Sequence, residues 1–134
     1  MMAHQITLIP GDGIGPEVAD ATVRAVDATG AQIEWERVDA GARALAEHGQ
    51  LIPDDVFASL EMTRVGLKGP TTTPIGGGHQ SINVALRKKL GLYTNFRPVR
   101  MLPGLKTRYQ DLPLDLAIFR ENTEDLYSGL EHEV

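Results

Sequence analysis

The stretch QITLIPGDGIGPEVADATVRAVDATG, residues 5–30, decides the fold because it joins a short strand, a glycine-rich turn and a helix. Its first five residues are rich in apolar and β-branched side chains, which favours a strand at Gln5–Ile9. Pro16 suits the first position of a helix and Gly30 suits its end, so we expect a helix from Pro16 to about Thr29. A strand that turns directly into a helix is typical of an α/β domain.

The residues that follow repeat this alternation. The same patterns predict strands at Ile33–Val38 and Val65–Lys68, and helices at Ala42–His48 and from Pro53 to about Leu60. Alternation of this kind predicts an α/β fold built on a parallel sheet.

Ligands of open parallel sheets gather beyond the carboxyl ends of the strands. The glycine-rich loops 11–15 and 69–78 follow predicted strands and so occupy that position. Arg120, at the end of the apolar run Leu114–Phe119, is expected there as well.

The glycines within residues 11–15 invite comparison with the dinucleotide-binding fingerprint of Rossmann folds. Glu36 or Asp39 lies about 20 residues further on, where that pattern has an acidic residue. The third glycine of the fingerprint would fall at position 16, however, and this residue is Pro16. We therefore expect a tight strand-to-helix turn here rather than an ordinary Rossmann phosphate site.

A second informative stretch, HQSINVALRKKLGLYTNFR at residues 79–97, predicts a cationic helix followed by a strand. Ser81 is a suitable N-cap, and Gly91 is a suitable end for the helix. Asn83 and Arg87 are four residues apart and therefore project from one face. Because a helix N-terminus offers unpaired N–H groups and a partial positive charge, this segment is a candidate carboxylate site.

Charge is segregated along the chain. Residues 62–110 contain 9 of the 13 lysines and arginines and none of the 18 acidic residues. The formal net charge of -5 therefore hides a cationic region that would attract an anion of several charges. A solvated basic surface is the simpler interpretation for Lys88, Lys89, Lys106 and Arg108.

Length and composition fit one soluble globular domain of 134 residues with 42% hydrophobic residues. The chain has no cysteine, so disulfides and thiolate chemistry are excluded. No apolar run approaches the roughly 20 residues of a membrane span, and the start MMAHQITLIP does not have the pattern of a signal peptide. We expect a cytoplasmic protein without membrane or nucleic-acid partners.

Tyr127 is a candidate general acid near the end of the chain. A tyrosine has an ordinary pKa of about 10, so it keeps its proton at neutral pH and could donate it to an enolate-like oxygen. A single tyrosine is also common as a packed residue, and the residues alone leave both interpretations open.

Four blocks of sequence match one known family in order and approximate spacing. They are GDGIGPEV at 11–18, LKGPTTTPIGGG at 67–78, SINVALRKKLGLYTNFRPVR at 81–100 and FRENTEDLYSG at 119–129. Together they resemble the isocitrate dehydrogenases of the β-decarboxylating (isocitrate/isopropylmalate) dehydrogenase family. The resemblance implies that family's α/β fold, with residues 1–99 forming part of the large cofactor-binding domain and residues 100–134 the start of the small domain.

The resemblance also implies roles for individual residues. It assigns isocitrate binding to Ser81, Asn83, Arg87, Arg97 and Arg120. Two small polar groups and three guanidiniums suit a tricarboxylate. Tyr127 matches the catalytic tyrosine, which helps to protonate the enolate after loss of carbon dioxide, and Thr72 and Thr73 match the loop near the nicotinamide. Ser81 and Asn83 favour isocitrate over isopropylmalate, whose enzymes carry more apolar surface at this helix.

The implied activity is NAD- or NADP-dependent oxidative decarboxylation of isocitrate to 2-oxoglutarate by a longer enzyme, expected to be a homodimer. The family's catalytic lysine, its magnesium- or manganese-binding aspartates and its adenosine-binding loop match nothing before Val134, so we expect no metal ligand in this chain. A homoisocitrate or isopropylmalate dehydrogenase is the nearest alternative. A regulatory or truncated chain that binds the anion without turnover is another.

Overall fold

The computed structural model describes residues 3–72 and 81–124 of the chain. It divides into two compact units, Met1–Ala85 and Leu86–Val134. Among the described residues, no helix is both long and apolar enough to cross a membrane. Two candidate site residues, Thr73 and Tyr127, lie outside the described residues.

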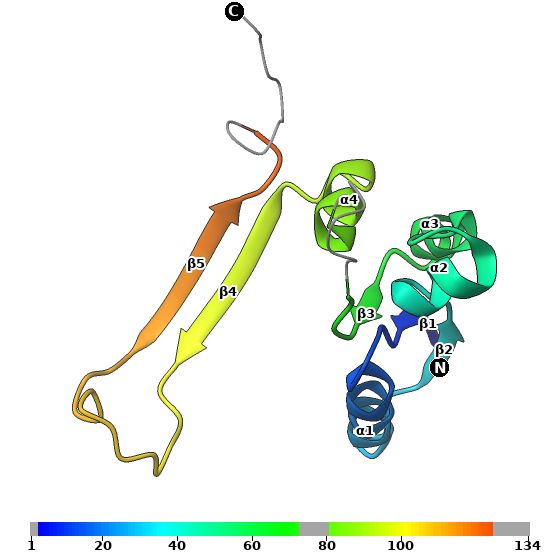
Figure 1. Ribbon diagram of the computed structural model, residues 1–134. Helices are drawn as coiled ribbons and strands as arrows, with labels where there is room; N and C mark the ends of the chain where they lie inside the picture. The colour runs from blue at the N-terminus through cyan, green and yellow to red at the C-terminus, as the bar shows by residue number, and fades with distance from the viewer. Residues whose placement is uncertain (1–2, 73–80, 125–134) are drawn as a thin grey trace, which may run out of the picture. The chain divides into compact units, whose positions relative to one another are not determined.

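The first unit contains a parallel sheet with the strand order β2-β1-β3 (Figure 1). The strands are β1 His4–Ile9, β2 Ile33–Arg37 and β3 Gly66–Lys68. Leu8 of the central strand lies opposite both Arg37 and Leu67. Because β1 has a neighbour on each side, Thr7, Leu8 and Ile9 are almost completely buried.

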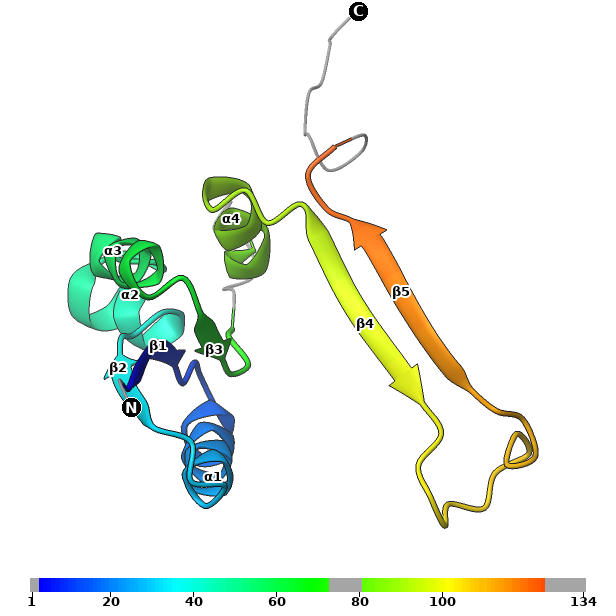
Figure 2. The same cartoon turned by 180° about the vertical axis from the view of Figure 1, so that it is seen from behind.

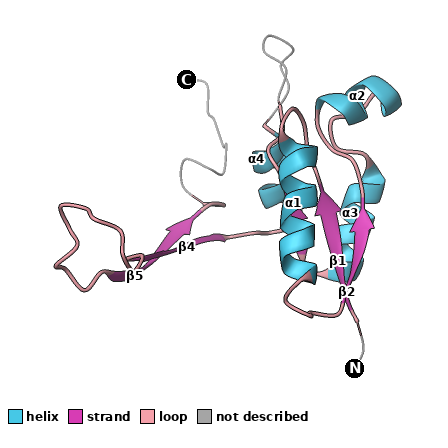
Figure 3. Cartoon of the chain, turned by 90° about the horizontal axis from the view of Figure 1, so that it is seen from below, coloured by secondary structure: helices cyan, strands magenta, loops and turns pink. Residues whose placement is uncertain are grey.

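Helices cover both faces of this sheet, with α1 on one face and α2 and α3 on the other (Figures 1 and 3). The helices are α1 Gly15–Asp27, α2 Ala42–His48 and α3 Asp54–Thr63. Trp35 of β2 donates a hydrogen bond to Asp27 of α1 at 3.1 Å. On the other face the Thr7 hydroxyl lies 2.7 Å from the Ser59 hydroxyl of α3. The result is a three-layer arrangement around one buried sheet.

Among the described residues of this unit, the fully buried side chains are apolar except for hydroxyl groups that bind one another. Its buried side chains include Leu8, Ile9, Ala19, Val38, Ala40, Ala44, Val56 and Phe57. The buried hydroxyl of Thr7 contacts those of Ser59 and Thr63, each at 2.7 Å. Because these polar groups are paired with one another, their burial does not leave an unsatisfied donor.

The second unit is built mainly from an antiparallel pair of strands, β4 Thr94–Arg100 and β5 Asp115–Glu121 (Figure 2). The ladder runs without a bulge from Thr94 opposite Glu121 to Arg100 opposite Asp115. Phe96 and Phe119 pack together with their ring centroids 5.0 Å apart. Helix α4, Ile82–Lys89, precedes this pair and contains the boundary between the two units.

The structure confirms most of the elements predicted for the first unit. Helix α2 has the predicted bounds, and α1, β1 and β2 differ from the prediction by one or two residues at an end. Helix α3 continues three residues beyond Leu60, where its end is closed by a hydrogen bond from the Arg64 N–H to the Leu60 carbonyl at 3.0 Å. The predicted end of α4 before Gly91 is also confirmed.

The prediction that Arg120 follows a strand of the parallel sheet is wrong. Arg120 lies in β5, which pairs antiparallel with β4 and not with β1, β2 or β3. A local apolar pattern predicts a strand but not its partner, so the pattern of Leu114–Phe119 does not indicate which sheet this strand joins. The predicted division of large and small domains between residues 99 and 100 falls inside β4 and stays a prediction.

Candidate functional site

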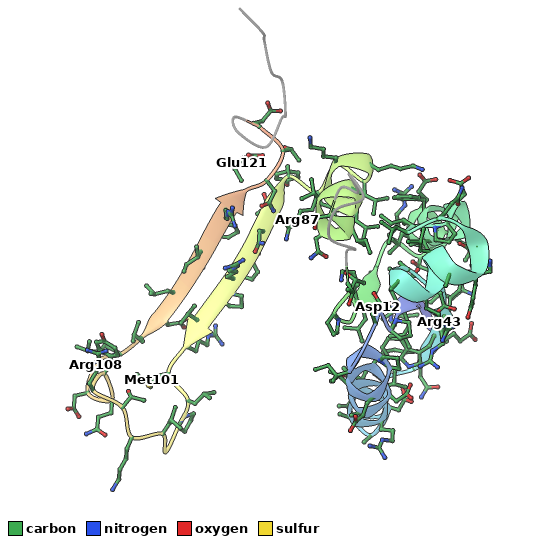
Figure 4. All side chains as sticks on the ribbon, in the orientation of Figure 1. Asp12, Arg43, Arg87, Met101, Arg108 and Glu121 are labelled. Atoms are coloured by element: carbon green, nitrogen blue, oxygen red, sulfur yellow. The ribbon has the colours of Figure 1, made fainter. Side chains whose placement is uncertain are left out.

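Three chain segments meet at the carboxyl edge of the parallel sheet, and Asp12 connects them. They are residues 10–15 after β1, residues 38–43 after β2 and residues 69–72 after β3. Oδ2 of Asp12 accepts hydrogen bonds from the Thr72 N–H at 2.6 Å and the Ala42 N–H at 3.0 Å. Its Oδ1 accepts one from the Arg43 N–H at 3.3 Å. Figure 4 shows Asp12 beside Arg43 at this edge.

Glycines allow these segments to approach one another backbone to backbone. A Cβ atom on Gly11 would overlap the carbonyl oxygen of Pro70, and one on Gly69 would overlap that of Pro10. Gly41, with a φ of 113°, leaves free the space that the Asp12 carboxylate fills. The predicted place of both glycine-rich loops at the carboxyl ends of strands is confirmed for residues 11–15 and 69–72.

The surroundings of Asp12 favour its charged form. Partial burial raises the pKa of this carboxyl. The N–H groups of Thr72, Ala42 and Arg43 and the nearby charge of Lys68 together lower the pKa by more than burial raises it, so it lies below its ordinary value of 3.8. Lys68 in turn donates hydrogen bonds to the Gly69 carbonyl at 2.7 Å and the Thr71 hydroxyl at 3.1 Å.

The amino end of α1 does not have the character of a dinucleotide-phosphate site. Glu17 lies in its first turn, and Pro16 has no N–H to donate. One oxygen of Glu36 is buried with no hydrogen-bond partner among the described residues, and Asp39 pairs with Arg43. The tight-turn interpretation of residues 11–15 is supported by the hydrogen bond from the Gly15 N–H to the Asp12 carbonyl at 2.9 Å and by the positive φ of Gly11 and Gly13.

Thr72 is the one predicted cofactor-binding residue that the described part of the chain contains. It is exposed at the carboxyl edge, and its N–H is held by Asp12. Its hydroxyl could exchange hydrogen bonds with a carboxamide such as that of nicotinamide. The described residues therefore fit one contact with the nicotinamide end of a cofactor.

Helix α4 carries three of the predicted substrate-binding residues. The Ser81 carbonyl accepts a hydrogen bond from the Ala85 N–H at 2.9 Å, which places Ser81 at the N-cap position as predicted. Ile82 and Leu86 are buried, and Asn83 and Arg87 lie one position further round the helix. Asn83 is exposed and Arg87 is partly exposed, so both can present polar groups on one side of α4. Figure 4 labels Arg87 on this helix.

The strand pair brings the other two predicted substrate-binding residues together. Asn95 lies opposite Arg120, and residues that face each other in an antiparallel ladder share one face. Arg97 is two residues from Asn95 and therefore lies on the same face. The Arg97 guanidinium donates a hydrogen bond from Nε to the Asn95 side-chain oxygen at 3.0 Å. Two guanidiniums thus share one face, with the Phe96–Phe119 pair on the other.

A carboxylate also shapes the turn that follows β5. Glu121 accepts hydrogen bonds from the Thr123 N–H at 2.6 Å, the Thr123 hydroxyl at 2.7 Å and the Glu124 N–H at 2.9 Å. The hydroxyl and N–H of Thr123, with smaller effects from Glu124 and Asn122, lower the pKa of Glu121 to about 2. Asn122 is buried, and its N–H donates to the Tyr93 carbonyl at 2.9 Å.

A divalent metal does not fit the described residues. Within residues 3–72 and 81–124, no group of three or more histidine, cysteine, aspartate or glutamate side chains lies in an arrangement that could hold an ion. The carboxylates of Asp12 and Glu121 are occupied by backbone N–H donors. The described part of the chain therefore supplies polar and cationic contacts rather than a metal centre.

The sequence interpretation missed Asp12 and Glu121. Asp12 stands between two glycines in a predicted turn, where an acidic side chain often accepts hydrogen bonds from nearby N–H groups. The spacing of Glu121 and Thr123 carries a similar local signal. The partners of Asp12 are 30 and 60 residues away, however, and only the three-dimensional contact identifies them.

The sequence matches the isocitrate/isopropylmalate dehydrogenase family over residues 5–134. It is 49% identical over 128 residues to the mitochondrial isocitrate dehydrogenase [NAD] catalytic subunit 5 of Arabidopsis thaliana, covering 96% of this chain and 34% of that protein. It is 48% identical over 128 residues to the chloroplastic 3-isopropylmalate dehydrogenase of Solanum tuberosum, and this match covers 96% of this chain and 35% of that protein. Its structure resembles isocitrate dehydrogenase from Methylococcus capsulatus, with a TM-score of 0.86, 46% identity, and 98% and 38% of the chains covered.

The chain spans about a third of the length of the curated relatives that it matches. Relatives named as NAD and as NADP isocitrate dehydrogenases both occur, and one is named as a regulatory subunit. Their names differ in substrate, cofactor and role, but all of them are named as isocitrate or 3-isopropylmalate dehydrogenases or subunits of these. Since the family match covers nearly the whole chain and solved relatives have the same fold, the chain belongs to the isocitrate/isopropylmalate dehydrogenase family.

Proposed function

We propose that this chain forms the N-terminal part of an enzyme that oxidatively decarboxylates isocitrate to 2-oxoglutarate with NAD or NADP. The observation that carries this proposal is the pair Arg97 and Arg120 on one face of the β4–β5 ladder. Arg97 lies within residues 62–110, which contain no acidic residue. Diagonal neighbours on such a ladder are about 7–8 Å apart, so two guanidiniums can bind different carboxylates of one small polyanion.

The substrate in this proposal is held by five residues. Arg97 and Arg120 bind carboxylates, Arg87 adds a third guanidinium, and Ser81 and Asn83 supply hydrogen bonds from the start of α4. The hydrogen bond to Asn95 holds the Arg97 guanidinium in place before substrate arrives, which reduces the ordering that binding requires. A substrate with three carboxylates uses this arrangement more fully than one with an apolar side chain.

The reaction also needs a hydride acceptor, a base that takes the proton of the substrate hydroxyl, and a proton donor for the enolate; we assign the base to no residue of this chain. The nicotinamide, when bound, accepts hydride from the hydroxyl-bearing carbon of the substrate. In our proposal Thr72 and Thr73 contact the nicotinamide end of the cofactor, and Tyr127 gives a proton to the enolate that loss of carbon dioxide leaves. Because the described residues do not fit a metal, we assign no step to one.

Isopropylmalate and homoisocitrate are the main alternative substrates. The similarity to a 3-isopropylmalate dehydrogenase supports isopropylmalate as one of these alternatives. We propose isocitrate because Ser81 and Asn83 are polar and exposed at the start of α4, where an isopropyl group would need apolar contacts. A regulatory chain that binds the anion without turnover is a second alternative. A homodimeric enzyme in the cytoplasm remains our expectation.

Substrate competition in the longer enzyme tests this proposal. We expect the kcat/KM for isocitrate to exceed those for isopropylmalate and homoisocitrate by at least about tenfold with the preferred cofactor. Replacing Asn83 by leucine should lower this ratio, whereas Lys106→Leu, a change of a surface lysine outside the proposed site, should leave it unchanged. A preference for isopropylmalate would overturn the substrate assignment, and binding of isocitrate without turnover of any of the three would favour the regulatory alternative.

A further inference from the structure

We propose that Asp12 is a positioning residue whose carboxylate fixes the Gly69–Thr72 loop against the loop after β1 and the start of α2. The consequence for catalysis rests on the proposed function, in which the loop that contains Thr72 approaches the nicotinamide. In that setting Asp12 would act through Thr72 and would not touch the reacting atoms.

Both ends of the Gly69–Thr72 loop are held by hydrogen bonds. At its start, the Gly69 N–H donates to the Ile9 carbonyl at 2.8 Å, which continues the β1–β3 ladder. At its end, the Thr72 N–H donates to Oδ2 of Asp12 at 2.6 Å. Between these points the Asp12 N–H donates to the Pro70 carbonyl at 2.8 Å. Asp12 therefore binds the loop in both directions, as donor and as acceptor.

A carboxylate has the acceptor capacity that this position needs. Three N–H donors, from Thr72, Ala42 and Arg43, converge on its two oxygens. An alanine would leave all three without this acceptor, whereas an asparagine could keep its one oxygen toward Thr72 and Ala42 and lose only the longer bond from Arg43. The two substitutions should therefore differ in which backbone amides lose their protection from hydrogen exchange.

The surrounding groups fit the same interpretation. Gly41 provides the space for the carboxylate, since any Cβ there would overlap it. Lys68 lies near enough to favour the charged form and itself binds the Gly69 carbonyl and the Thr71 hydroxyl. Lys68, the charged group near Asp12 on β3, is therefore bound to the same loop. The side chain of Arg43 on α2 is paired with Asp39.

Amide hydrogen exchange of the 134-residue chain, measured by NMR without substrate or cofactor, tests the proposal. In Asp12→Ala we expect the Thr72 and Ala42 amides to exchange at least about tenfold faster than in the unaltered chain. The Val38 amide, which donates to the Leu8 carbonyl at 3.0 Å inside the sheet, should change much less. In Asp12→Asn the Thr72 amide should stay protected while the Arg43 amide becomes faster.

Asp20→Ala is the matched control, because it removes another aspartate of the same unit that pairs with Arg37 on the surface. It should leave the exchange of Thr72 unchanged. Equal acceleration at Thr72 and Val38 in Asp12→Ala would indicate general destabilisation and would overturn the proposal, and so would an unchanged Thr72 amide. If Asp12→Ala does not fold, loss of Thr72 protection in Asp12→Asn equal to the loss at Arg43 would overturn it. Because no step of the test depends on turnover, its outcome is independent of whether the proposed substrate is correct.

Discussion

At the scale of single residues, the candidate substrate site depends on two arginines that the ladder register places on one face. Arg97 precedes the chain reversal and Arg120 follows it, 23 positions later in the sequence. Their shared face follows from the pairing of Asn95 with Arg120. A diffuse cationic surface would make any of the nearby lysines equivalent to them, whereas a bidentate site would not.

We therefore expect Arg97→Met or Arg120→Met in the longer enzyme to raise the KM for isocitrate far more than Lys106→Met. Loss of one bidentate partner leaves a substrate carboxylate unpaired. The expected loss of transition-state stabilisation, calculated from the ratio of kcat/KM values, is about 2–5 kcal/mol, whereas an exposed lysine contributes about 0–1 kcal/mol. Steady-state kinetics at constant ionic strength would measure the difference. Equal effects of the three substitutions would mean that the region acts only through its general charge.

At the scale of elements, the difference between what local sequence predicts and what it does not is clear in β3 and β5. The pattern predicts a strand at Val65–Lys68, and Gly66–Lys68 forms β3 in the parallel sheet as expected, because the run stands in a repeated strand–helix alternation. The run Leu114–Phe119 is equally apolar, yet the strand that it overlaps, β5, pairs antiparallel with β4 across the loop of residues 101–114. Periodicity specifies which side chains alternate but carries no information about the partner strand.

The candidate site shows the same division. Ser81 at the N-cap and Asn83 with Arg87 four positions later could be predicted, since helix capping and helical spacing are local. The role of Asp12 could not, because its partners come from two other loops. The turn after β5 is an intermediate case. The hydrogen-bond partners of Glu121 are within three residues and could be predicted, but how strongly they bind depends on the charge of the Glu121 carboxylate.

The Glu121 turn should respond to acid at an unusually low pH. The pKa of Glu121 in the folded chain is about 2, below its ordinary value of 4.5. Because the folded pKa is lowered, the carboxylate stabilises the turn fully above about pH 4.5, and this contribution is lost as the pH falls toward 2. The Thr123 amide shift, followed by NMR from neutral to acidic pH, should change with a midpoint near 2.

Replacing Thr123 by valine provides the matched control for this measurement. It removes the hydroxyl that contributes most to the lowered pKa and keeps the backbone donor, so the midpoint should move toward 4.5. In Glu121→Gln the acid transition of the Thr123 amide should disappear. A midpoint close to 4.5 in the unaltered chain would show that the carboxylate does not hold this turn.

At the scale of the whole molecule, the two units differ in how much of their apolar surface is buried. In the first unit the sheet has helices on both faces, and its central strand is almost inaccessible. In the second unit the β4–β5 pair exposes apolar side chains on both of its faces, including Phe96 at 53%, Val99 at 43%, Ile118 at 46% and Phe119 at 70%. A pair of strands with little covering surface is only marginally stable in water.

We therefore expect the second unit of the 134-residue chain to open more readily than the first. Amides in the β4–β5 ladder should exchange at least about a hundredfold faster than those of β1, because protection scales with the free energy of the opening that exposes each amide. A fluorescent dye that binds exposed apolar surface should bind the chain, and Phe96→Ser together with Phe119→Ser should reduce that binding. The pair Leu102→Ser and Leu105→Ser, in the loop between the strands, removes exposed apolar side chains without touching the ladder and serves as the control. Equal protection in β1 and in the β4–β5 ladder would mean that the strand pair is covered in solution. The arginine face would then be less accessible to a polyanion than its exposure indicates.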